Sequence, residues 1–358
     1  FITGTFNKAS KEEATELPNV SDIVNMEIEL NGERFSMTED NLKEYSRTLN
    51  LYMGETCRNV LWEGKNGNVV QLSFHRFVSY KNVHVIGAYV EIKPVNCDVK
   101  ATVVSGINAQ VTNNGAQHLT EVSKRAFDEK YLQMGMVTTE SEVVIAVSTV
   151  HDVFLDGEKT EETAYKIVDD RRKIHAKIQL DIPKGETARV EKISTVHSSR
   201  DLEYTGSGKE PDKETVYANG LENLKEAECK GYRTLLQESR EVWEAIWKKQ
   251  DIVIDSREDD AQVAVRFALY HLQIMVRKED NRVGIGAKAL SGEGYKGHSF
   301  WDTETFIFPY FQMAEPEVAR TLLEFRYKGL YGARKKAKEN GYKGCLLYTS
   351  DAADDLIG

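Results

Sequence analysis

The chain has 358 residues, with 47 lysines and arginines against 57 aspartates and glutamates, which gives a formal net charge of −10 at pH 7. Charged residues make up 29% of the chain and hydrophobic residues 41%, as in a soluble globular protein with two or more domains. No basic patch favours a nucleic-acid partner, and no stretch is long and apolar enough to span a membrane. Of the four cysteines, Cys57, Cys97 and Cys229 are widely spaced and show neither metal-ligand spacing nor a disulfide pattern. We therefore expect a reducing, cytoplasmic location.

The first 200 residues are predicted to form an antiparallel β-sandwich domain. Met26, Ile28 and Leu30 alternate with polar residues and run into Asn31-Gly32, a strong hairpin signal. Asn66-Gly67 signals a second hairpin between two apolar runs. Further strands separated by turn residues are predicted at 83–92, 100–107, 131–138, 142–149, 174–180 and 188–197.

Residues 201–250 are predicted to form linker helices. A Gly- and Pro-containing stretch at 205–211 has linker composition, and apolar residues then recur at helical spacing. Gly231 is expected to separate two helices. Trp243 and Trp247 lie one turn apart, so the pair is predicted to be a docking surface. His271, on a later apolar helix face, is interpreted as a core residue rather than a catalytic one.

A glycine-rich stretch from Gly286 to Gly297 is the most informative part of the chain, because it excludes a regular helix or strand. It ends in an aromatic pair and two carboxylates, Phe300-Trp301-Asp302-Thr303-Glu304, followed by an apolar run at 306–311 that is predicted to be a helix buried on most sides. An indole beside a fixed carboxylate suits a sugar, whose ring packs on the aromatic face while its hydroxyls donate to the acid. A buried Trp-Asp pair with a packing role is the alternative.

The motif resembles that of glycoside hydrolase family 65, with similarity from about Phe1 to Gly344. The resemblance rests on Gly284-Ile285-Gly286-Ala287-Lys288, Phe300-Trp301-Asp302-Thr303-Glu304, Phe325-Arg326-Tyr327, Ala333-Arg334-Lys335-Lys336-Ala337 and Gly341-Tyr342. It implies an N-terminal β-sandwich, a helical linker and the first part of an (α/α)6 catalytic barrel at 251–344. It also implies that Trp301 and Asp302 line the subsite of the non-reducing glucose, with Phe300 and His298 as weaker candidates. Ala289 departs from the family, which usually has glycine there.

The reaction implied by this resemblance is phosphorolysis of an α-glucosyl disaccharide with inversion, giving β-glucose 1-phosphate and glucose. Inorganic phosphate is the co-substrate, and neither a cofactor nor a metal is expected. Because phosphate replaces both the water and the base of an inverting hydrolase, one general acid on the protein suffices. In the family this glutamate lies downstream of Gly344, so neither Glu293 nor Glu304 is assigned the role. The chain is therefore expected to be an inactive fragment of an enzyme that is a homodimer at full length.

Two other functions remain open. A hydrolase of the same family, such as a trehalase, would use a second carboxylate as base. A non-enzymatic sugar-binding sandwich would need an exposed aromatic platform, but Trp62, the one tryptophan before residue 200, sits beside a hairpin turn where packing is the usual role.

The ends of the chain carry a separate expectation. Residues 345–354 resemble the translated read-through of a transposase-based sequencing-library adapter, so 345–358 are expected to be a foreign tail. That tail contributes three of the carboxylates, Asp351, Asp354 and Asp355. The first residues resemble a stretch already inside the family's first domain, so the true N-terminus is expected to be missing.

Overall fold

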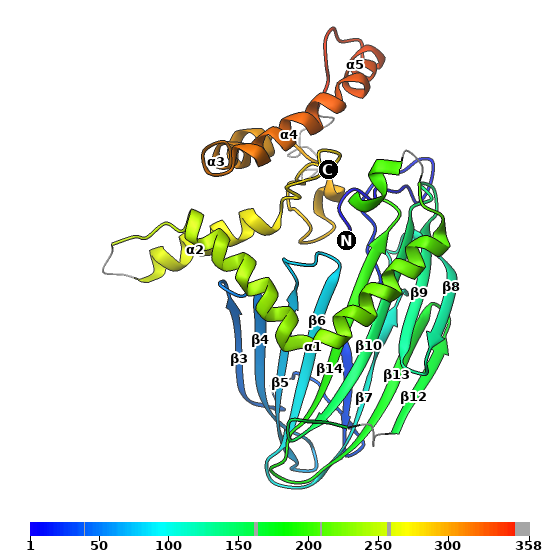
Figure 1. Ribbon diagram of the computed structural model, residues 1–358, viewed down its shortest axis with the longest axis vertical. Coiled ribbons are helices and arrows are strands. Elements are labelled where there is room, and N and C mark those ends of the chain that lie inside the picture. Colours follow the sequence, from blue (N-terminus) through cyan, green and yellow to red (C-terminus); the bar gives the residue numbers. More distant parts are fainter. Residues whose placement is uncertain (39, 161–163, 208–209, 256–258, 348–358) are drawn as a thin grey trace.

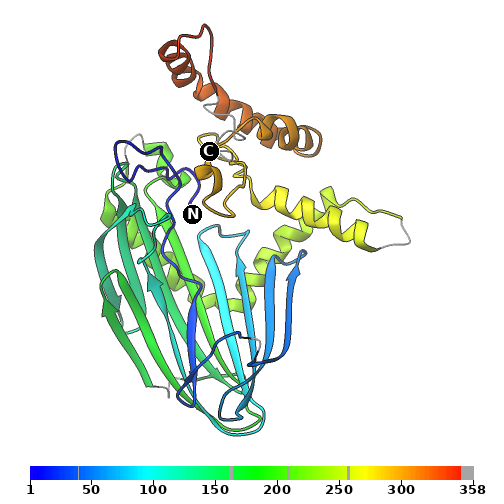
Figure 2. The same ribbon diagram turned by 180° about the vertical axis from the view of Figure 1, so that it is seen from behind.

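The structure, a computed structural model, describes residues 1–38, 40–160, 164–207, 210–255 and 259–347. In these ranges, all β-strands precede residue 200 and all α-helices follow it. Figures 1 and 2 show a β-sandwich with one long helix across its face and shorter helices beyond one end of the sandwich. The predicted change from strands to helices near Arg200 is confirmed. Most of the foreign tail proposed for 345–358 lies outside the described residues.

The larger sheet has nine antiparallel strands and forms one layer of the sandwich. Its order is β3 (Leu42–Asn50), β4 (Glu55–Glu63), β5 (Val69–Val78), β6 (Val85–Pro94), β14 (Ala188–Ser198), β10 (Val144–Leu155), β9 (Tyr131–Thr138) and β8 (Leu119–Phe127), with β11 (Glu158–Thr160) paired to β10. The predicted hairpin at Asn66-Gly67 joins β4 to β5.

The smaller sheet has five strands and forms the second layer. Its order is β12 (Ala164–Asp170), β13 (Lys173–Ile182), β7 (Val99–Asn108), β1 (Met26–Leu30) and β2 (Glu33–Arg34). Asn31 and Gly32 both adopt positive φ, 50° and 81°, between β1 and β2. Two consecutive positive φ angles are what a tight hairpin turn requires, so this hairpin is also confirmed.

The interior of the sandwich is apolar at both ends and polar between them. One cluster surrounds the fully buried Trp62, which confirms its predicted packing role, and the other surrounds Leu132 and Met134. His151 and Lys192 are buried outside both clusters, and the Lys192 ammonium donates to the Gly106 carbonyl over 2.8 Å. Because lysine is almost never fully buried without a charged partner, these two residues mark an unusual part of the core.

Helix α1 (Lys213–Gln250) packs on β14, β10 and β6 and covers the outer face of the larger sheet (Figure 1). It begins where the Asp212 carboxylate accepts from the Thr215 amide over 2.8 Å, a typical N-cap. Gly231, with φ 73° and ψ 166°, breaks the helix in two, as predicted. There the Tyr232 amide donates to the Glu191 carboxylate over 2.7 Å, which fixes the bend on β14.

Trp243 and Trp247 form the predicted docking surface. Both are buried, and Trp243 stacks on Tyr270 with ring centroids 4.8 Å apart. Tyr270 belongs to α2 (Asp259–Ile274), so the pair joins the linker to the following helices. The remaining helical segments are η1 (Leu202–Ser207), η2 (Gly294–Gly297), η3 (Thr303–Ile307), α3 (Phe308–Ala314), α4 (Pro316–Lys328) and α5 (Leu330–Glu339). Within the described residues, no helix combines the length and apolar character of a membrane span.

The structure corrects the interpretation of the apolar run at 306–311. Phe311 is fully buried, but the Phe306 side chain is 66% exposed, so the helix is not buried on most sides. The chain forms a π-helical turn over 303–307 before α3 begins. Only one face of α3 packs against the small cluster around Ile285 and Val318, and the opposite face meets no neighbour there.

Candidate functional site

The glycine-rich stretch folds into a tight loop between α2 and η3. A Cβ on Gly286 would lie 2.9 Å from the Gly297 carbonyl oxygen, so the two ends of the loop approach each other too closely for a side chain. Ala289, Tyr295 and Lys296 have positive φ angles of 48°, 57° and 53°. A non-glycine residue pays a steric cost in this region. Glycine would suit position 289 better, which fits the departure noted from the sequence.

Residues near the N-terminus hold this loop in place. The Leu17 amide donates to the Lys296 carbonyl over 3.1 Å, and the Asn19 side-chain amide donates to Glu293 over 2.7 Å. His298 Nε2 lies 2.6 Å from the Thr15 carbonyl, and the imidazole stacks on Phe6 with centroids 5.0 Å apart. Since a carbonyl can only accept, His298 donates at Nε2. These contacts give His298 a structural role, and its role toward a sugar stays a prediction.

The loop delivers Phe300, Trp301 and Asp302 with very different exposure. Phe300 is buried and meets Tyr295 edge to face at 5.5 Å. Trp301 is 49% exposed and lies 5.7 Å from the exposed Phe306. Asp302 is half-buried, precedes the helical turn at 303–307, and makes no capping hydrogen bond with it. An exposed indole beside a carboxylate not used as a cap can accept a sugar, and neither group is committed to packing alone.

Arg326 of α4 anchors the base of this motif. Its guanidinium donates to Glu304 over 2.6 and 3.1 Å and to the Phe300 carbonyl over 3.1 Å. Thr303 donates its hydroxyl to the Ile285 carbonyl over 3.0 Å. A bidentate pair of this kind fixes both partners. Glu304 therefore orients the motif through Arg326, a contact that sequence reasoning did not identify although both residues carried the resemblance.

Three sizeable cavities lie elsewhere, with volumes of about 360, 690 and 650 Å³. The first lies between the two sheets, and the other two lie where the sandwich meets residues 273–290. Trp301 and Asp302 line none of these three cavities.

One cluster among the described residues has the composition of a metal site: His84, His197 and Asp201. Its hydrogen bonds oppose metal binding. His84 Nδ1 lies 2.9 Å from the Val196 carbonyl and must donate to it. The Asn223 side-chain amide donates to His197 Nε2 over 3.1 Å, which places the proton of the neutral ring on Nδ1. Both Nδ1 atoms therefore carry hydrogen and face the Asp201 carboxylate, at 3.7 Å from His84 and 3.5 Å from His197, so neither offers a lone pair to a metal ion at this point.

Comparison with protein families matches two models. Residues 1–246 match the N-terminal domain of glycosyl hydrolase family 65, and residues 266–354 match the central catalytic domain of the same family. The second match extends beyond Gly344 into the segment that we expect to be a foreign tail, and that expectation stays a prediction.

Two curated proteins and one solved structure that resemble this chain all carry the description kojibiose phosphorylase. The chain is 40% identical to a kojibiose phosphorylase of Halothermothrix orenii, covering 99% of this chain and 45% of the relative. It is 35% identical to a kojibiose phosphorylase of Escherichia coli, over 97% of this chain and 44% of the relative. A solved structure assigned as a kojibiose phosphorylase from the human microbiome shares the fold, with a TM-score of 0.80 at 19% identity, over 94% of this chain and 44% of that one. The chain thus spans about half the length of these relatives.

Proposed function

Because the chain belongs to glycosyl hydrolase family 65, we propose that it is part of an inverting disaccharide phosphorylase. The reaction is the conversion of an α-glucosyl disaccharide and phosphate into β-glucose 1-phosphate and glucose. The observation that carries the proposal is that two domain models of the family match one chain, and that this chain is 40% and 35% identical to two kojibiose phosphorylases. Kojibiose is therefore the first substrate to test, followed by trehalose, nigerose and maltose.

Trp301 and Asp302 are proposed to hold the non-reducing glucose. The exposed indole face of Trp301 packs on the pyranose ring, and the Asp302 carboxylate accepts from its hydroxyls. The bidentate Arg326–Glu304 pair supports this assignment, because it keeps the motif rigid while leaving Asp302 out of the pair. Phosphate acts as co-substrate, and no cofactor is required.

The remaining parts of the proposal concern the whole protein. Helices α2 to α5 are proposed to begin the (α/α)6 barrel, with domain boundaries at 200, 250 and 344. The general acid is proposed to lie downstream of Gly344, as in the family, so that this chain by itself is inactive. We also propose that the full-length protein is a homodimer and is located in the cytoplasm.

The test uses the enzyme encoded when the source reading frame is extended beyond Gly344. Glucose release from each disaccharide is measured with and without phosphate. Asp302→Ala should lower kcat/KM at least about tenfold, because a hydrogen bond to a charged group contributes about 1.5–3 kcal/mol. The melting temperature should stay within about 2 °C of the wild type.

Glu317→Ala, at an exposed acid in the first turn of α4, is the matched control and should leave kcat/KM unchanged. Phosphate-independent glucose release would show a hydrolase instead. Full turnover per folded Asp302→Ala molecule, together with a lowered melting temperature, would show that the Trp-Asp pair only packs.

A further inference from the structure

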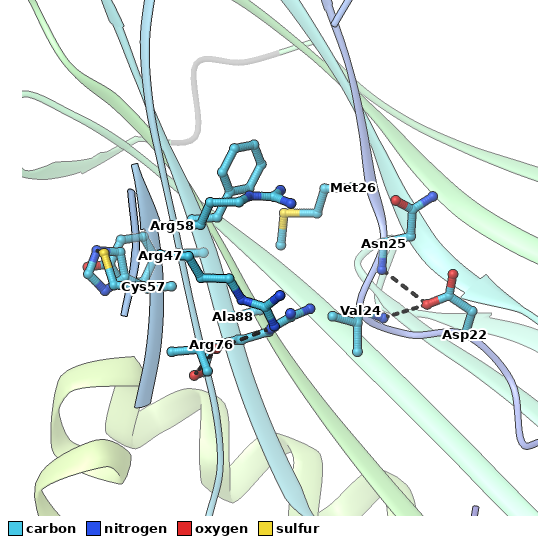
Figure 3. Close-up of a pocket in the computed structure, with 13 residues that line it drawn as sticks. Asp22, Val24, Asn25, Met26, Arg47, Cys57, Arg58, Arg76 and Ala88 are labelled. Atoms are coloured by element: carbon cyan, nitrogen blue, oxygen red, sulfur yellow. Dashed lines mark hydrogen bonds between the residues drawn. The ribbon is translucent and has the colours of Figure 1, made fainter. Parts of the chain in front are cut away.

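A cleft in the sandwich is lined by arginines on one wall (Figure 3). Its volume is about 360 Å³, and it lies between the inner face of β3, β4 and β5 and the segment that leads into β1. Arg47, Arg58 and Arg76 come one from each strand, and Figure 3 shows the Arg47 and Arg76 side chains extending toward Val24 on the opposite wall. We call this pocket, with Arg47, Arg58 and Arg76 on one wall, the arginine cleft.

Strand register places the three guanidiniums on one face. Arg47 is the direct cross-strand partner of Arg58, and Thr56 is the partner of Arg76. Since side chains alternate along a strand, Thr56 and Arg58 point to the same face, and Arg76 therefore shares that face with both other arginines. The convergence thus follows from the hydrogen-bond pattern of the sheet.

Two of the guanidiniums are held in position before any ligand arrives. Arg58 lies over the Phe74 ring, 4.3 Å from its centroid, and Arg76 Nε donates to the Thr56 hydroxyl over 3.2 Å. Arg58 Nε is buried without a hydrogen-bond partner. Groups fixed in advance lose less entropy on binding, and an unpaired buried donor gains more when an acceptor reaches it.

No carboxylate balances these charges. Within the described residues, none of the three arginines lies within 4.0 Å of an acidic oxygen. Asp22 lines the opposite wall, but its Oδ1 already accepts from the Val24 and Asn25 amides over 2.9 and 3.1 Å. Burial and the neighbouring Arg76 and Arg47 charges hold the pKa of Arg58 below its ordinary value. Like charges in direct cross-strand register destabilise a sheet, so the bare cleft carries a cost.

We propose that the arginine cleft binds a dianionic phosphoryl group, either inorganic phosphate or the phosphate of a sugar monophosphate. Arginine forks match the oxygens of phosphate in pairs, and three of them exceed the two charges of the ligand. The cleft volume is about twelve times the roughly 30 Å³ share of a liquid water, so a phosphorylated monosaccharide fits as well as free phosphate. The inference stands independently of the proposed phosphorolysis, since it rests on residues of the sandwich alone.

The test measures binding to this chain by isothermal titration in phosphate-free buffer at constant ionic strength. One arm uses inorganic phosphate and the other glucose 1-phosphate. Arg58→Gln and Arg76→Gln should each weaken binding about tenfold or more, because each removes charge-assisted hydrogen bonds. Arg233→Gln, at an exposed position of α1, is the matched control and should leave binding unchanged.

The melting temperature of Arg47→Gln is a second readout, because the substitution should affect stability differently with and without phosphate. Arg47→Gln should raise the melting temperature in phosphate-free buffer, because it relieves the repulsion with Arg58, and it should also reduce the stabilisation that added phosphate confers on the wild type. A variant that was merely damaged would lose melting temperature under both conditions.

The outcomes separate clearly. Equal affinity for both probes identifies free phosphate as the ligand, and tighter binding of glucose 1-phosphate identifies a sugar phosphate. The proposal is overturned if neither probe binds the wild-type chain, or if Arg76→Gln binds the probes as tightly as the wild type does. Arg76 is exposed, so its substitution decides the matter even if Arg58→Gln does not fold.

Discussion

Lys192 offers a direct test of how the polar middle of the core affects stability. It is 1% exposed, and its direct partners across the sheet are Ala88 on β6 and His151 on β10. Burial lowers the pKa of Lys192 from 10.5 to about 7, against a small opposing effect of Asp22. The substitution Lys192→Met keeps the length of the side chain and removes the charge.

The size of the stability change follows from the linkage between proton binding and folding. The unfolded chain keeps the lysine proton up to about pH 10.5, whereas the folded chain releases it near pH 7. Between these values the unfolded state binds more protons, so stability rises with pH. At about 1.36 kcal/mol per pKa unit, the buried lysine costs about 4 kcal/mol at pH 7 and almost nothing at pH 10.5. Losing its bond to the Gly106 carbonyl offsets about 1 kcal/mol.

We therefore expect Lys192→Met to be more stable than the wild type by about 3 kcal/mol at pH 7, with the difference gone by about pH 10. Urea unfolding at several pH values, followed by tryptophan fluorescence, measures it. Lys177→Met, at an exposed position of β13, is the control and should show no such trend. An equal difference at pH 7 and pH 10, or a less stable Met variant at pH 7, would refute the reasoning.

Two further substitutions test the backbone geometry at Ala289 and at Gly106. Ala289→Gly should stabilise the fold by about 1 kcal/mol, because Ala289 has φ 48°; an unchanged melting temperature would show that the loop relaxes at no cost. Gly106→Ala should destabilise by about 1–3 kcal/mol or more, because its Cβ would collide with the backbone of Ile174 and His175. Gly332→Ala in α5, where a Cβ meets nothing within 4 Å, is the control; equal melting temperatures for the two alanine variants would contradict the collision.

The sequence predicted the central strands and missed three of the four edge strands. β1, β4, β5, β6, β7, β9, β10, β13 and β14 all appear at or near predicted positions. β3, β8 and β12, which were not predicted, are edge strands of the two sheets, and β11 pairs only with β10. The residues of β3 are exposed at almost every position. A strand with no buried face has no apolar alternation, so periodicity cannot detect it.

The sequence predicted the adjacent residues of the candidate site but not the long-range contacts that hold them. Local sequence identified Phe300, Trp301 and Asp302 together, since they are adjacent. It could not show that Arg326 clamps Glu304, because that contact joins residues 22 positions apart on separate helices. The arginine cleft was equally hidden, because it depends on the register of three strands and not on any spacing along the chain.

The contact between His298 and Thr15 spans 283 positions of the chain, which has a consequence for the order of folding. During synthesis, the N-terminal segment around Thr15 cannot contact the glycine-rich loop until the polypeptide has grown past residue 298. Closing so long a loop is entropically costly, so contacts of this separation form after the nearer strand pairs. We expect the sandwich to be complete before the glycine-rich loop closes, and the loop to reopen at lower free energy than the sandwich unfolds. Trp301 and Asp302, which follow this loop, would then be among the last residues of this chain to become ordered and among the first to become disordered.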